Sequence, residues 1–129
     1  MKHLTLCILA ALTACLSQSC SKKARTSAPP AAPVVMTTDF QSGFTQNKVQ
    51  FFIDDRRIFD EKLTTAAVGG LAHTDETVLE GGLHKLRILV DGVQQKDTTL
   101  DLQRNLYLGV NLSAGEIRLL ISDARWAYE

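Results

Sequence analysis

Residues Gly81 to Asp101, which read GGLHKLRILVDGVQQKDTTLD, decide how this chain folds. Every second residue from 86 to 90 is aliphatic, which is the period of two that a half-buried strand requires. The dipeptide Asp91-Gly92 separates this run from a second one that extends to residue 102. Because a tight hairpin turn requires positive φ at its central residues, the pattern predicts a β-hairpin with strands at 84–90 and 94–102.

Runs of the same kind lie on both sides of this hairpin. They predict strands at 48–53, 58–63, 106–112 and 117–121, and a short strand around Val78-Leu79. Strands at regular spacing, joined by short turns and without a convincing helix, predict an all-β domain. We expect an antiparallel immunoglobulin-like β-sandwich of about seven strands, with a closed barrel as the alternative.

The start of the hairpin also carries a resemblance. The stretch Leu79 to Arg87, LEGGLHKLR, resembles the glycine, histidine and alternating aliphatic residues that begin a strand in small immunoglobulin-like and PEGA-like envelope modules. The resemblance covers this stretch alone. It implies a sandwich fold and assigns no functional residue.

Charge and cysteine content limit the function of the domain. Residues 39–129 contain 10 Lys and Arg against 14 Asp and Glu, a net charge of −4. This balance argues against a nucleic-acid partner, which would require a basic face. The three cysteines are Cys7, Cys15 and Cys20, so we expect neither a disulfide nor a cysteine metal site in the domain.

The N-terminus has the features of an export signal. A basic start is followed by an apolar stretch from Leu4 to Leu12 and then by Leu12-Thr13-Ala14-Cys15. These four residues resemble the lipobox of bacterial lipoproteins, which implies cleavage before Cys15 and acylation of its thiol. On this interpretation residues 1–14 are a signal peptide, and Cys20 is the alternative lipidation site. An ordinary cleaved signal without a lipid is the other possibility.

The segment after the signal contains all three prolines of the chain. Residues 15–38 are rich in Ser, Ala, Pro and Thr and have no hydrophobic period, which predicts a disordered tether before a β-sandwich domain at 39–129. We therefore expect a lipoprotein anchored in the bacterial cell envelope, on the outer membrane or the periplasmic face rather than in the cytoplasm.

Catalytic and metal-binding patterns are weak. His73 and His84 are the only histidines after the signal, and with nearby acids they could form a metal site or the centre of an envelope enzyme. The sequence contains no HExxH spacing, nucleophile elbow or phosphate-binding glycine loop. The acids at 54–55 and 60–61 flank a turn, where aspartate is expected for backbone reasons. We expect no catalytic residue, no metal and no cofactor.

Aromatic residues are the more informative candidates. All five phenylalanines lie between residues 40 and 59, and the adjacent Phe51 and Phe52 must face opposite sides of one strand. Trp126 and Tyr128 would share one face of a C-terminal strand, and on one interpretation this strand covers Phe52. Core packing and an exposed binding strip formed by Phe52, Trp126 and Tyr128 are the two interpretations. The sequence thus favours a non-catalytic module that binds an envelope protein or glycan.

Overall fold

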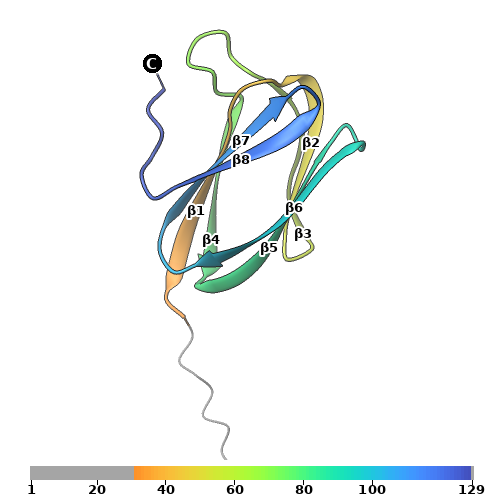
Figure 1. Ribbon diagram of the computed structural model, residues 1–129. Coiled ribbons are helices and arrows are strands. Elements are labelled where there is room, and N and C mark those ends of the chain that lie inside the picture. The colour runs from red at the N-terminus through yellow and green to blue at the C-terminus, as the bar shows by residue number, and fades with distance from the viewer. Residues whose placement is uncertain (1–30, 129) are drawn as a thin grey trace, which may run out of the picture.

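The computed structural model describes residues 31–128, which form a sandwich of two four-stranded sheets (Figure 1). In chain order the strands are β1 (Pro33–Phe40), β2 (Thr45–Ile53), β3 (Arg56–Thr64), β4 (His73–Glu80), β5 (Gly82–Val90), β6 (Gln94–Leu102), β7 (Leu106–Ser113) and β8 (Glu116–Ser122). The predicted β-sandwich is confirmed, with eight strands among the described residues instead of about seven.

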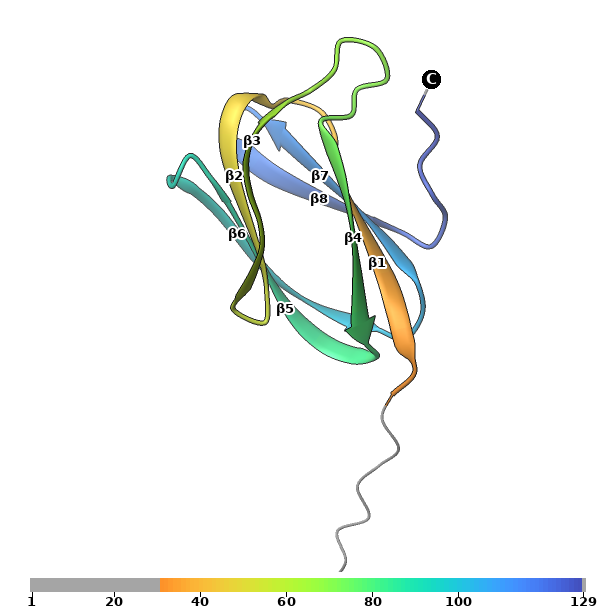
Figure 2. The same ribbon diagram turned by 180° about the vertical axis from the view of Figure 1, so that it is seen from behind.

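The two sheets differ in how their strands are paired. Sheet A has the order β4-β1-β7-β8, and sheet B has the order β3-β2-β5-β6. Strand β1 pairs antiparallel with β4 and parallel with β7, so sheet A is mixed and not purely antiparallel as predicted. Figures 1 and 2 show the two sheets from opposite sides, facing each other as separate layers and not as one closed barrel.

The hairpin predicted from the sequence is present in sheet B. Strands β5 and β6 pair in continuous register from Gly82↔Leu102 to Val90↔Gln94. The turn residues Asp91 and Gly92 have φ values of 53° and 66°, which is the left-handed conformation that a tight hairpin turn requires.

Two aspartates in turns extend the pairing between the central strands of sheet B. Asp91 accepts a hydrogen bond from the backbone N–H of Lys48 at 2.8 Å, and its own N–H donates to the carbonyl of Lys48. At the other end, Asp54 forms the same two hydrogen bonds with Lys85, at 2.9 and 2.8 Å. These carboxylates therefore hold the backbone of the neighbouring strand, which is the backbone role expected for aspartate at the turn after β2.

The first strand corrects one sequence prediction. We expected a disordered tether to extend from 15 to 38, but β1 starts at Pro33, so the structured domain begins before residue 39. Val34, Met36, Thr38 and Phe40 alternate toward the core and are all buried. The prolines concealed this period, although proline is tolerated at the first position of a strand.

Two glycines let the chain cross between the sheets. Residues 73–80 form β4 of sheet A, in a region where we predicted only a short strand at Val78-Leu79, and residue 82 already belongs to β5 of sheet B. Gly82 has a φ of +123°, which favours glycine. A Cβ on Gly81 would lie 3.2 Å from the carbonyl oxygen of Leu102 and 3.2 Å from the Cβ of Ala31. A sharp crossing at this position therefore requires small residues.

The core lies between the inner faces of the two sheets. Phe40 is fully buried at its centre, stacked on Phe59 with a centroid distance of 5.4 Å and meeting the rings of Phe44 and Phe51 edge-on. Four of the five phenylalanines are therefore structural. The buried apolar residues are Val34, Met36, Phe40, Phe44, Val49, Phe51, Ile53, Phe59, Leu63, Leu86, Ile88, Val90, Leu100, Leu102, Leu108, Val110 and Ile117.

Candidate functional site

Phe52 is the one phenylalanine that the core does not bury. Its neighbours Phe51 and Ile53 face inward and are at most 2 % exposed, whereas Phe52 is half-buried on the outer face of sheet B. The expectation that Phe51 and Phe52 face opposite sides is thus confirmed. An aromatic ring on the outer face of a sheet has no packing role in the sandwich core, so this position is the first candidate for binding.

Charged residues lie on both sides of Phe52. In the strand register, Phe52 is opposite Arg57 of β3 and opposite Arg87 of β5, and Arg87 is in turn opposite Asp97 of β6. The Nε of Arg87 donates to Asp97 at 2.9 Å, and Nη1 of Arg57 donates to Asp60 at 3.1 Å. In the register Phe52 therefore lies between two arginines, and an aspartate accepts a hydrogen bond from each of them.

A shallow hollow of about 270 Å³ opens at this row. Its lining combines one aromatic ring with charged and hydroxyl side chains from the β2–β3 turn, β5 and β6. The lining residues are Phe52, Asp55, Lys85, Leu86, Arg87, Asp97, Thr98 and Thr99. An apolar ring surrounded by hydrogen-bonding groups can hold a ligand that has both apolar and polar faces.

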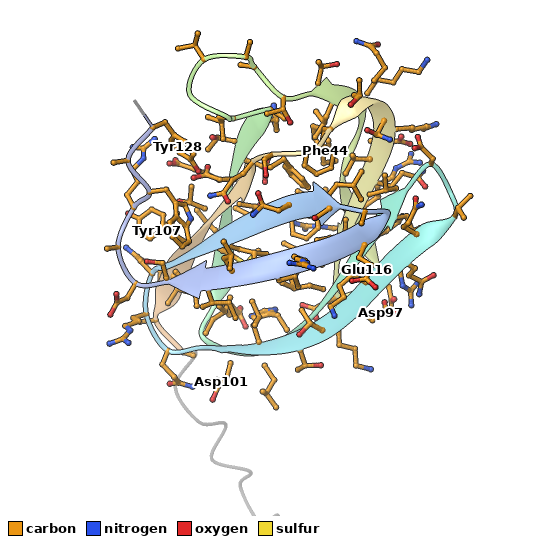
Figure 3. All side chains as sticks on the ribbon, turned by 45° about the horizontal axis from the view of Figure 1, so that its top comes forward. Phe44, Asp97, Asp101, Tyr107, Glu116 and Tyr128 are labelled. Atoms are coloured by element: carbon orange, nitrogen blue, oxygen red, sulfur yellow. The ribbon has the colours of Figure 1, made fainter. Side chains whose placement is uncertain are left out.

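The other two predicted binding residues lie on a different part of the molecule. Strand β8 ends at Ser122, so Trp126 and Tyr128 lie in an irregular segment and not in a terminal strand as expected. This segment turns back beside β1 of sheet A (Figure 1), and Tyr128 and Asp97 lie on different sides of the domain in Figure 3. The suggestion that the C-terminus covers Phe52 was therefore wrong, and the three aromatics do not form one strip.

Tyr128 ends a chain of hydrogen bonds on the outer face of sheet A. Its hydroxyl donates to Oδ2 of the buried Asp39 at 2.7 Å, and accepts from the side-chain amide of Gln41 at 2.9 Å. Gln41 in turn accepts from Asn111 at 2.8 Å, while Thr74 donates to the other oxygen of Asp39 at 2.8 Å. Each polar group in this chain has its partner, and the chain attaches the C-terminal segment to the centre of the sheet.

The aromatic residues of this segment are half-buried. Burial, followed by the hydrogen bond to the Asp39 carboxylate, raises the pKa of Tyr128 to about 12, so the phenol stays protonated and donates throughout the neutral range. The indole nitrogen of Trp126 is buried and has no hydrogen-bond partner among residues 31–128. Whether either residue binds a ligand stays a prediction, but the contacts of Tyr128 are those of a structural residue.

We expect Tyr128→Phe to destabilise the domain by about 1–3 kcal/mol, because it leaves the buried Asp39 carboxylate and the Gln41 amide without one partner each. Urea denaturation at pH 7 measures this change. Tyr107→Phe is the matched control, since the Tyr107 hydroxyl makes no hydrogen bond to any side chain or backbone group within 31–128. An equal loss of stability in both variants would show that the chain of hydrogen bonds is not what holds the segment.

The two histidines lie far apart. His73 is the first residue of β4 and its ring stacks on Phe59 at a centroid distance of 4.6 Å, so it is part of the aromatic cluster. His84 contacts the carbonyl of Glu80, the last residue of β4. His73 and Glu80 are the two ends of β4, which is about 23 Å long at ~3.3 Å per residue, so His84 lies at the opposite end of this strand from His73. They therefore do not share a metal site.

The geometry around His84 defines its protonation. Its Nδ1 lies 2.6 Å from Oδ2 of Asp54 and its Nε2 lies 2.7 Å from the Glu80 carbonyl oxygen. A carboxylate and a carbonyl oxygen only accept, so both ring nitrogens must donate, and the imidazolium satisfies this arrangement. The hydrogen bond to Asp54 raises the pKa of His84 above its ordinary value of 6.5, against an opposing effect of burial.

The pH dependence of stability follows from this shift. Because the folded-state pKa of His84 is raised, its contribution is fully present below about pH 6.5 and is lost as the pH rises through the folded-state pKa. We expect a loss of about 1 kcal/mol above that range, since Asp54 is half exposed and solvent screens its charge. Urea denaturation between pH 5.5 and 8.5 should show this slope in the wild type and a smaller slope in His84→Gln. Identical slopes would exclude the His84 ion pair as the cause.

Three further observations concern metal binding, the membrane and the lipid anchor. Within residues 31–128, no three His, Cys, Asp or Glu side chains are grouped so that they could hold a metal ion. No helix in this part of the chain is long and apolar enough to cross a membrane. The signal peptide and both candidate lipidation sites, Cys15 and Cys20, lie outside the described residues.

Comparisons with known proteins add no assignment. No family model matches the chain, and neither do the curated proteins or the solved structures. The sequence and the structure together therefore define a small all-β domain of two sheets, with the hollow at Phe52 as its candidate binding surface.

Proposed function

We propose that this protein is a non-catalytic binding module of the bacterial cell envelope, held at the membrane by a lipid on Cys15, or alternatively on Cys20. Its immunoglobulin-like sandwich presents the outer face of sheet B to an envelope partner, either a protein or a glycan. The support for the anchor is the lipobox-like LTAC sequence after a basic and apolar start.

The position of Phe52 supports the binding role. Aromatic residues and arginine are enriched at protein interfaces, and a few such residues surrounded by a polar rim carry most of the binding energy. Phe52 has these surroundings: it lines the 270 Å³ hollow together with Lys85, Arg87 and Asp97. The core does not require its ring, since the inner face of β2 is already filled by Val49, Phe51 and Ile53.

Loss of the Phe52 ring tests this role. Full-length protein with its acyl chain is incubated with a solubilised envelope fraction, and the bound protein and glycan are recovered and quantified. We expect Phe52→Ala to reduce recovery of the ligand roughly 10- to 30-fold, which corresponds to a hot spot of about 1.4–2 kcal/mol.

The matched control removes a different exposed apolar side chain from the same sheet. Val93→Ala changes the β5–β6 turn, where Val93 is 79 % exposed, and should leave recovery unchanged. If both variants recover the same material as the wild type, the outer face of sheet B at Phe52 is not the binding surface.

A further inference from the structure

The outer face of sheet B has a charge opposite to that of the domain. Residues 31–128 contain ten basic and 13 acidic residues, a net charge of −3. The outward strand positions of sheet B carry five basic and three acidic residues, a net charge of +2. The basic ones are Lys48, Arg57, Lys62, Lys85 and Arg87, and the acidic ones are Asp60, Asp97 and Asp101. Asp55 in the β2–β3 turn adds one acid at the end of the hollow.

Several of these cations are available to a ligand. Lys62 and Lys85 form no ion pair with any residue of 31–128, and Arg87 uses only Nε in its hydrogen bond to Asp97. Lys62 is also directly opposite Lys48 in the register, and Lys48 is paired with Asp60 at 3.5 Å, whereas Lys62 is not. An anionic group bound at Lys62 would supply the partner that this lysine lacks.

The basic positions form a strip with the aromatic ring inside it. Lys48 and Lys62 lie at one end, the row through Arg57, Phe52 and Arg87 follows, and Lys85 lies at the other end. Strand β2 and the turn after it cover six residues between these ends, which is about 20 Å at ~3.4 Å per residue. Gln50 and Thr99, between and beside the cations, offer amide and hydroxyl groups.

This combination of groups selects among anionic ligands. A membrane surface would require a group of protruding apolar side chains to insert. Phe52 is half-buried within a hollow, and the exposed Leu83 and Val93 lie singly at opposite ends of β5. Double-stranded nucleic acid carries one charge per ~1.7 Å, a density that the few cations of this face without an ion pair do not offset. A chain of sugar rings presents apolar C–H faces to a ring and hydroxyls to polar side chains. Acidic groups on such a chain would pair with the free cations.

We infer that this strip binds an acidic polysaccharide, with one sugar ring against Phe52 and its carboxylate or phosphate groups at the lysines and arginines. This inference rests on the proposed function and specifies the ligand for the same face. The negative charge of the rest of the domain directs the polymer to this side, because it repels the anion elsewhere.

Titration calorimetry of the full-length protein with oligogalacturonate, and with its methyl ester as the uncharged counterpart, tests the inference. We expect the free acid to bind at least tenfold more tightly than the ester and to weaken as salt rises. Lys62→Gln combined with Lys85→Gln should weaken binding about tenfold, and so should Phe52→Ala. Arg118→Gln removes a cation from the outer face of sheet A, where Arg118 pairs with Asn111, and should change nothing.

Two further binding measurements distinguish other sources of the anion. If phosphorylated mannan binds and oligogalacturonate does not, and if this binding also depends on Phe52, the charged group of the ligand is a phosphate. Vesicles rich in phosphatidylglycerol that bind through the lysines but independently of Phe52 would overturn the inference in favour of a lipid surface.

The remaining outcomes also decide the question. Equal binding of acid and ester, or no binding of any charged glycan, overturns the inference. If recovery from the envelope fraction still depends on Phe52 in that case, the proposed binding function stands and only the ligand class is wrong. If recovery does not depend on Phe52, the proposed function fails as well.

Discussion

Replacing Phe40 with alanine should cost about 3–5 kcal/mol of the free energy of unfolding, the largest effect that we expect from any single truncation in this domain. Phe40 has no exposed surface, stacks on Phe59 and meets Phe44 and Phe51 edge-on. Its removal leaves a cavity between the two sheets and breaks these aromatic contacts. Small domains are often stable by only about 5–15 kcal/mol, so the variant should be close to unfolding at 37 °C. Urea denaturation followed by far-UV circular dichroism gives the value.

Phe52→Ala is the matched control for this change. It removes the same atoms from a half-buried ring on the outer face of sheet B, and we expect it to cost no more than about 1 kcal/mol. If the two variants lost similar stability, Phe40 would not be the centre of the core. The same control verifies that Phe52→Ala is folded when its ligand binding is measured.

Gly43→Ala should destabilise the domain by about 2–4 kcal/mol, although Gly43 lies at the surface. A Cβ at this position would lie 1.7 Å from the carbonyl oxygen of Leu112, a distance that forces the backbone to move. Gly43 also has a φ of +93°, which side chains rarely adopt. The neighbouring Ser42 carbonyl accepts a hydrogen bond from the Leu112 N–H at 2.9 Å, so the movement breaks the end of the β1–β7 pairing.

Gly92→Ala separates the two causes of this effect. Gly92 also has positive φ, at +66°, but no atom lies within 4 Å of the added Cβ. Gly92→Ala should therefore lower the free energy of unfolding only by the cost of holding alanine at positive φ, about 1–2 kcal/mol. Thermal or urea denaturation of both variants measures the difference. A loss in Gly92→Ala as large as that in Gly43→Ala would mean that the contact with Leu112 is relieved at little cost.

Local patterns in the sequence predicted the strands whose alternation is aliphatic. The β5–β6 hairpin is the clearest case, because its period and its Asp91-Gly92 turn are both local signals. Strand β1 was missed because the buried residues Thr37, Thr38 and Asp39 are polar, and the partners of the Asp39 carboxylate are the distant residues Thr74 and Tyr128. Its parallel pairing with β7 joins residues about 70 positions apart, which leaves no local pattern to detect.

The candidate site shows the same division between local and distant information. The alternation of Val49, Phe51 and Ile53 was sufficient to place Phe52 on the outer face. Sequence spacing did not reveal that Arg57 and Arg87 lie on both sides of its ring, because that arrangement depends on the register of three strands. Trp126 and Tyr128 were assigned to a strand from their spacing of two, whereas the hydrogen bonds of Tyr128 attach an irregular segment to Asp39.

The placement of β1 has a mechanical consequence. This strand is the first of the domain, yet it is central in sheet A, registered with β4 over eight residue pairs and with β7 over five. Tension applied at Ala32 acts along the strand axis, so it loads both ladders in shear and their hydrogen bonds must break together. Strand β8 at the sheet edge pairs only with β7 and can be peeled away bond by bond. Since the unfolding barrier governs forced unfolding, a domain held from its N-terminal side is loaded where it resists force most strongly.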